Sequence, residues 1–68
     1  MILKNNLKTE RERLGITQAT LAETIGVSRK TINTIENSVF VPSTILALKL
    51  AKAFDRQVED LFQLDETE

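Results

Sequence analysis

Residues 18–37, QATLAETIGVSRKTINTIEN, contain two short helical patterns on either side of a glycine. Apolar side chains recur at helical spacing before and after Gly26, which favours two helices joined by a tight turn. In the second helix, Ile32 and Ile35 share one face. The opposite face carries cations, amides and a hydroxyl, from Arg29, Lys30, Asn33, Asn37 and Thr34. A helix divided in this way suits a nucleic-acid groove.

The small and polar residues of this stretch meet the requirements of two crossing helices. Ala22 is small, which lets the two helices approach closely where they cross. Gly26 permits the left-handed backbone that ends the first helix. Ser28 can cap the second helix through its hydroxyl, and Thr17 or Gln18 can cap the first.

Taken in register, the pattern Gln18-x-x-x-Ala22-x-x-x-Gly26-Val27-x-x-x-x-Ile32-x-x-Ile35-Glu36 resembles the helix-turn-helix of the phage repressor and Cro family, the XRE family. The segments ENSVFVPSTILALKLAKAF (36–54) and VEDLF (58–62) resemble the usual continuation of that family. The resemblance is greatest to small stand-alone members such as the cytolysin-operon repressor. It implies an all-α, five-helix fold of the lambda-repressor type, with the helix-turn-helix at residues 18–37.

Outside the helix-turn-helix, the sequence pattern predicts three further helices. The five predicted helices span 7–14, 18–25, 29–37, 44–54 and 58–62. Asn5 or Asn6 should cap the first of them, and Ser43 the fourth. The small members of the family add a strand pair formed by their termini. Whether residues 2–4 and 63–64 pair in this way is left open by the sequence.

Length and composition exclude several classes of protein. The chain has 68 residues, which predicts a single domain over 1–68 and only marginal stability as a monomer. Cysteine and histidine are absent, so disulfides, Cys/His zinc sites and catalysis by these residues are excluded. No nucleophile–base pair or metal cluster is evident, so we expect no enzyme activity, metal or cofactor. No signal peptide or membrane-length apolar run is evident, and we expect a cytoplasmic protein without membrane contact.

The charges are divided unevenly along the chain, although the net charge is −1. Residues 1–54 carry eight Lys and Arg against four Asp and Glu, a balance of +4. Residues 55–68 carry one Arg against six acids, a balance of −5, and end in an acidic tail at 65–68. Phosphates respond to the local charge rather than to the total, so the basic body is compatible with DNA binding.

Five residues of the second helix of the motif and its cap are candidates for contacts with DNA bases: Ser28, Arg29, Lys30, Asn33 and Thr34. In the docking geometry of this family, the start of that helix enters the major groove. Arg29 offers a fork that matches guanine, Lys30 can reach guanine or phosphate, and Asn33 can pair with adenine. Ser28 and Thr34 are shorter and could reach a phosphate, a base edge or a thymine methyl. Each of the five could instead be an ordinary exposed residue, and Ser28 only a cap.

The resemblance also implies contacts with the DNA backbone. Gln18 matches the position that holds the backbone from the start of the first motif helix, and Thr17 lies beside it. Asn37 and Ser38 match a second backbone-contacting loop. Each of these residues could equally be a cap or turn residue.

Arg11 and Glu36 are expected to have a structural role. A carboxylate near DNA repels phosphate unless it is neutralised, and Arg11 matches the family position that pairs with this glutamate. We therefore expect an ion pair between the first and third helices. The alternative, that Glu36 is a catalytic acid, has no second positioned group in its favour.

The two ends of the chain carry more apolar side chains than a small bundle requires, namely Ile2, Leu3, Val58, Leu61, Phe62 and Leu64. By the resemblance, these residues form a homodimer interface. The alternative is that they simply close the core of the monomer. A two-fold dimer would place two recognition helices one turn of DNA apart and favour an inverted-repeat operator.

Together these features predict a sequence-specific transcriptional regulator that binds double-stranded DNA, acting as a repressor on an inverted-repeat operator as a homodimer. Two alternatives stay open, a DNA-binding antitoxin that also neutralises a toxin partner and a protein-interaction module that kept the fold. The polar face of Arg29, Lys30 and Asn33 argues against the second alternative.

Overall fold

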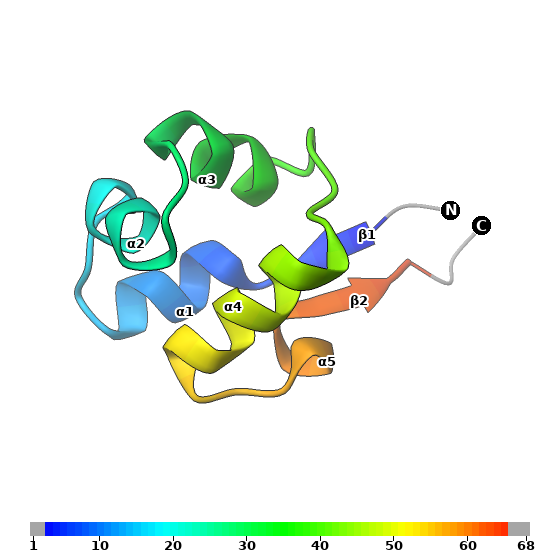
Figure 1. Ribbon diagram of the computed structural model, residues 1–68. Coiled ribbons are helices and arrows are strands. Elements are labelled where there is room, and N and C mark those ends of the chain that lie inside the picture. Colours follow the sequence, from blue (N-terminus) through cyan, green and yellow to red (C-terminus); the bar gives the residue numbers. More distant parts are fainter. Residues whose placement is uncertain (1–2, 66–68) are drawn as a thin grey trace.

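The computed structural model describes residues 3–65, which form five helices and two short strands (Figure 1). In chain order these are β1 (Leu3–Asn5), α1 (Leu7–Arg13), α2 (Gln18–Ile25), α3 (Arg29–Glu36), α4 (Thr44–Phe54), α5 (Val58–Leu61) and β2 (Phe62–Leu64). All five predicted helices are confirmed, with ends within one residue of the prediction. Ile2 and residues 66–68 of the acidic tail lie outside the described residues.

Three of the predicted helix caps are confirmed. Thr17 accepts a hydrogen bond from the Thr20 backbone N–H at 3.0 Å, and Ser28 and Ser43 cap α3 and α4 in the same way. Of the two residues that could cap α1, the N-cap residue Asn6 makes no side-chain cap. The neighbouring Asn5 accepts from the Leu7 backbone N–H at 3.1 Å.

The turn between α2 and α3 depends on the left-handed backbone of Gly26, at φ 80° and ψ 36°. In this conformation the backbone N–H groups of Gly26 and Val27 both donate to the Ala22 carbonyl at 2.9 Å. The chain then turns directly into the Ser28 cap, so α2 and α3 lie against each other. α3 lies on the opposite side of the molecule from α5 (Figure 1).

The core lies between α4 and the other helices. Its fully buried side chains come from α1, α2, α3, α4 and α5: Leu7, Leu21, Ile32, Ile35, Leu50 and Leu61. One face of α4 packs into this core, while Ile45 and Leu48 on another face remain 69% and 56% exposed. Within residues 3–65, no helix is both long and apolar enough to cross a membrane.

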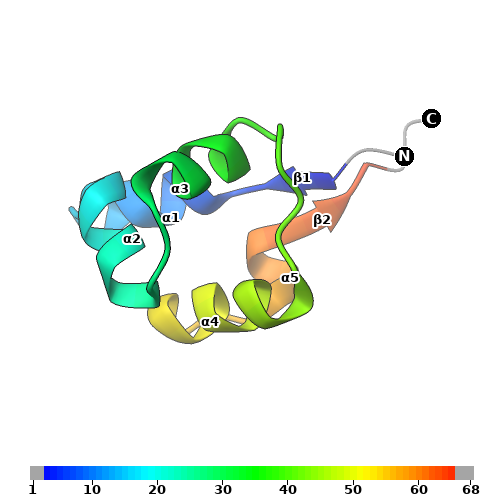
Figure 2. The ribbon, with the colours of Figure 1, turned by 45° about the horizontal axis from the view of Figure 1, so that its top comes forward.

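The two ends of the chain form a small antiparallel sheet. β1 pairs with β2 so that Leu3 lies opposite Leu64 and Asn5 opposite Phe62. The strand pair that the sequence left open is therefore present. It brings the first and last described residues together at one end of the molecule (Figures 1 and 2).

A separate ion-pair cluster joins α1 to the turn that follows α4. Glu10 accepts hydrogen bonds from Arg56 at 2.8 Å and from Arg13 at 3.1 Å. The hydrogen bond from Arg56 is the main reason that the pKa of Glu10 lies below its usual value, with a further lowering by Arg13.

Gly26→Ala should destabilise the protein by about 1 kcal/mol, because a Cβ is disfavoured in the left-handed region. A Cβ at this position would meet no atom within 4 Å, so the expected cost is conformational and not steric. Gly26→Asn should cost less, since Asn tolerates the left-handed region better than Ala. Denaturant unfolding measures both changes, and equal losses for the two variants would contradict this account.

Candidate nucleic-acid interface

The packing of one face of α3 against the core determines which of its side chains are exposed. Ile32 and Ile35 are 0% and 1% exposed, which fixes the rotation of the helix against the core. Arg29, Lys30 and Asn33 consequently lie exposed on the outer side. Neither Arg29 nor Lys30 forms an ion pair within the described part of the chain, so both cations are free to meet an anion.

The start of α2 contributes to the same surface. Gln18 joins Arg29, Lys30 and Asn33 in lining a shallow hollow between the two helices of the motif. Three of the predicted base-contacting residues and one predicted backbone-contacting residue are therefore brought together. The polar groups of this hollow suit hydrogen bonding to base edges and phosphates.

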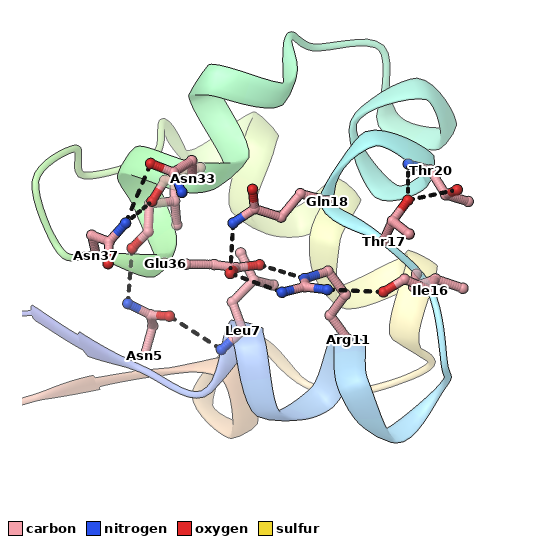
Figure 3. A network of polar contacts seen from close by, with 11 residues as sticks. Asn5, Leu7, Arg11, Ile16, Thr17, Gln18, Thr20, Asn33, Glu36 and Asn37 are labelled. Atoms are coloured by element: carbon pink, nitrogen blue, oxygen red, sulfur yellow. Dashed lines mark hydrogen bonds and ion pairs between the residues drawn. The ribbon is translucent and has the colours of Figure 1, made fainter.

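The side chain of Glu36 accepts hydrogen bonds from two different helices (Figure 3). Arg11 Nε donates to Glu36 Oε2 at 2.7 Å, and Arg11 Nη2 donates to Oε1 at 3.2 Å. Gln18 Nε2 donates to the same Oε1 at 3.0 Å. A third guanidinium nitrogen, Arg11 Nη1, donates to the Ile16 carbonyl at 2.9 Å.

This ion pair is nearly buried, with side-chain exposures of 11% for Arg11 and 3% for Glu36. The hydrogen bond to Glu36 raises the pKa of Arg11 above its usual value, so the guanidinium stays charged. The contact with Gln18 places the amide of that residue between the ion pair and the hollow. Gln18 therefore links the core contact to the outer surface.

The end of α3 is held by amide side chains. Asn37 Nδ2 donates to the Asn33 carbonyl at 2.9 Å and to Asn33 Oδ1 at 3.3 Å. Asn5 Nδ2 donates to the Ile35 carbonyl at 2.9 Å (Figure 3). Ser38 follows in the left-handed conformation, at φ 60°, and turns the chain away from the helix.

Asn5 is a residue of this site that the sequence did not identify, apart from its possible role as a helix cap. It links β1 to the end of α3, and the two residues in contact are 30 positions apart. An Asn pair before a helix is an ordinary cap signal. No local pattern could have pointed to this contact.

The predicted dimer residues are divided between surface and core. Leu64 is 56% exposed, and Leu3 and Val58 are half-buried. Leu61 is fully buried and Phe62 is 8% exposed, so both pack mainly inside the protomer. Leu61 therefore does not belong to the predicted interface, because its side chain has no exposed surface with which to contact a second protomer. Ile2 lies outside the described residues.

The fold and the outward polar helix define a DNA-binding protein of the helix-turn-helix class. A helix-turn-helix family model matches residues 7–61. An uncharacterized HTH-type transcriptional regulator of Bacillus subtilis (strain 168), YgzD, is 48% identical over 64 residues, which cover 94% of this chain and 97% of that protein. One from Methanothermobacter thermautotrophicus is 43% identical over 65 residues, or 94% of each chain. The chain belongs to the XRE-type helix-turn-helix family of DNA-binding transcriptional regulators.

Solved structures agree with this assignment. The restriction-modification controller protein C.AhdI from Aeromonas hydrophila superposes with a TM-score of 0.73 at 31% identity, covering 79% of this chain and 78% of that one. The SOS-response transcriptional repressor LexA from Eubacterium rectale gives a TM-score of 0.80 at 28% identity, covering 93% of this chain and 67% of that one.

Glu36→Gln should lower the free energy of unfolding by about 3 kcal/mol, because it leaves a nearly buried guanidinium without its counter-ion. The double variant Arg11→Met with Glu36→Leu should recover part of this loss, since no unpaired charge remains. Denaturant unfolding of the three proteins tests both statements. A single variant as stable as the natural protein would show that the ion pair contributes little.

Proposed function

We propose that this regulator is a repressor that binds an inverted-repeat operator as a homodimer, acting in the cytoplasm, where it occupies a promoter. The observation that carries the proposal is the face of α3 on which Arg29 and Lys30 stand exposed beside Asn33, with no ion-pair partner among residues 3–65. The solved structure of a LexA repressor with the same fold supports the assignment as a repressor.

In this proposal the recognition helix is α3, which lies in the major groove. Arg29 donates two hydrogen bonds to guanine O6 and N7, and Asn33 pairs with adenine through its amide. Lys30 reaches guanine or a neighbouring phosphate. Ser28 and Thr34 lie close to the base edges, although their hydroxyls are already hydrogen-bonded within α3.

The DNA backbone is held on both sides of the recognition helix. Thr17 and Gln18 stand at the start of α2, where free backbone N–H groups favour phosphate. Asn37 and Ser38 follow the end of α3 and form the second anchor. Their hydrogen bonds within the protein hold them in position before DNA arrives.

The dimer contact is proposed at the end of the molecule that carries the terminal sheet. Residues 37–48 contain no charged side chain, in a chain that is 28% charged. Three of the exposed apolar side chains of this stretch, together with one from the sheet, form what we call the apolar face: Val41, Ile45, Leu48 and Leu64. Depletion of charge and exposure of apolar groups are typical of the centre of an interface.

A hollow beside this apolar face extends the proposed contact. It is lined in part by Leu3, Pro42, Leu48, Val58 and Phe62. Leu3 and Val58, which the sequence offered for a dimer interface, line this hollow, and Leu64 belongs to the apolar face. The proposal adds to them the exposed side chains of α4 and of the loop before it.

Arg29→Ala should weaken binding to the specific operator by about 1–3 kcal/mol and relax the preference at one base position. Selection from random duplex DNA, followed by affinity measurements on the enriched sites, tests this expectation. An enriched inverted repeat supports the dimer as well. A uniform loss of affinity for all sequences would make Arg29 a phosphate contact only.

Leu48→Glu should separate the dimer, because it places a charge at the centre of the apolar face. Affinity for the full inverted repeat should then fall about 100-fold, while affinity for a single half-site is kept. Sedimentation equilibrium and binding titrations measure the two effects. Leu14→Glu is the matched control, since Leu14 is 45% exposed at the end of α1 and outside the apolar face. A Leu48→Glu protein that remains dimeric would exclude this interface.

A further inference from the structure

Asn5 connects the terminal sheet to the end of α3. Its amide Nδ2 donates to the Ile35 carbonyl at 2.9 Å and lies 3.4 Å from the Ser38 hydroxyl. Its Oδ1 accepts from the Leu7 backbone N–H at 3.1 Å, so both ends of the amide are engaged (Figure 3). One half-buried side chain therefore joins β1, the start of α1 and the last turn of α3.

The carbonyl to which Asn5 donates lies two residues before the segment proposed to hold the DNA backbone. This segment consists of Asn37 and Ser38, and the Ser38 backbone N–H donates to the same Ile35 carbonyl at 3.0 Å. Ser38 has a left-handed φ of 60°, a conformation that a residue with a side chain keeps only when its surroundings hold it there. The position of the segment therefore depends on the contacts made around the Ile35 carbonyl.

Apolar packing between the terminal sheet and the loop after α3 is incomplete. A cavity of about 200 Å³ lies between them, and its walls include Leu3, Asn5, Ser38, Val41 and Phe62. Side chains that border a cavity have no protein atoms to contact on that side, so they lose dispersion attraction. The hydrogen bonds of Asn5 therefore provide a large share of the connection between the sheet and the end of α3.

We propose that Asn5 is a positioning residue for DNA binding, which holds Asn37 and Ser38 where they meet a phosphate. The inference rests on the proposed function, in which these two residues form the second anchor on the DNA backbone. Asn5 does not touch DNA in this proposal, because its amide is bonded to Ile35 and Leu7 inside the protein. It acts by reducing the ordering that the anchor requires when DNA binds, and less ordering gives a higher affinity.

Asn5→Ser separates this role from the hydrogen bond to α1. The Ser hydroxyl can still accept from the Leu7 backbone N–H, as Ser does in local turns, but it is too short to reach the Ile35 carbonyl. Affinity for a duplex that contains one half-site of the selected operator should fall about fivefold, the value of one hydrogen bond. Fluorescence anisotropy measures the dissociation constant, and circular dichroism establishes that the variant is folded.

Asn6→Ser is the matched control. Asn6 Nδ2 also donates to a backbone carbonyl, that of Asp60 in α5, at 3.0 Å. Its loss should lower the stability of the fold but leave half-site affinity unchanged, because α5 has no proposed contact with DNA. Asn5→Asp is a second variant at the site, which keeps an acceptor for Leu7 and lacks the amide donor. It should bind the half-site at least as weakly as Asn5→Ser.

Neutral phosphates then show which contact Asn5 supports. Each phosphate of the half-site is replaced in turn by methylphosphonate, which removes its charge, and Asn37→Ala identifies the phosphate held by the second anchor. Neutralising this phosphate should weaken binding of the natural protein and of Asn6→Ser equally. The same replacement should have a much smaller effect on Asn5→Ser, because two changes to one coupled contact are not additive.

The outcomes are distinguishable from a failure of the proposed function. Natural half-site affinity in a folded Asn5→Ser or Asn5→Asp protein overturns this inference and leaves the proposed function standing. Equal losses in Asn5→Ser and Asn6→Ser also overturn it, as does a full effect of the neutral phosphate in Asn5→Ser, because Asn5 would then support only the stability of the fold. A folded natural protein that selects no duplex sequence overturns the proposed function and the inference with it.

Discussion

The ion pair between Arg11 and Glu36 is the contact on which the arrangement of the interface depends. A carboxylate that is 3% exposed needs its charge satisfied inside the protein, and Arg11 supplies that from α1. The same carboxylate accepts from Gln18, and Arg11 also bonds to the Ile16 carbonyl before α2. One pair of charges therefore fixes three helices relative to one another, and with them the angle at which α3 faces outward.

The described surface contains two regions of different chemistry. Around α3, the cations Arg29 and Lys30 stand without counter-ions in the described part of the chain, which suits the phosphates and base edges of DNA. At the end with the terminal sheet, the charge-free stretch 37–48 suits contact with another protein surface. The loop after α3 joins these two regions and carries the exposed apolar residues Val39 and Phe40.

The terminal sheet has a consequence beyond closing the fold. By pairing with β2, β1 is placed where Asn5 can donate to the Ile35 carbonyl at the end of α3. That carbonyl also accepts from the backbone N–H of Ser38, at the start of the loop that follows α3. The ends of the chain therefore help to hold the position of the loop, although they are far from α3 in sequence.

The sequence alone was sufficient to predict the bounds of the five helices and the position of the helix-turn-helix motif. These features depend on interactions between residues that are close together in the chain. The left-handed Gly26 and the caps at Thr17, Ser28 and Ser43 act locally, and the spacing of Ile32 and Ile35 marks the buried face. The exposed positions of Arg29, Lys30 and Asn33 on the opposite face of α3 follow from that spacing. Much of the candidate site could therefore be predicted from the sequence.

Contacts between segments that are far apart in the sequence could be identified only in the tertiary structure. The bond from Asn5 to Ile35 joins residues 30 positions apart, and the one from Arg56 to Glu10 joins residues 46 positions apart. The full burial of Leu61 follows from how α5 packs against the core. Periodicity and capping describe a single element, whereas burial and long-range hydrogen bonds depend on how the elements pack in three dimensions.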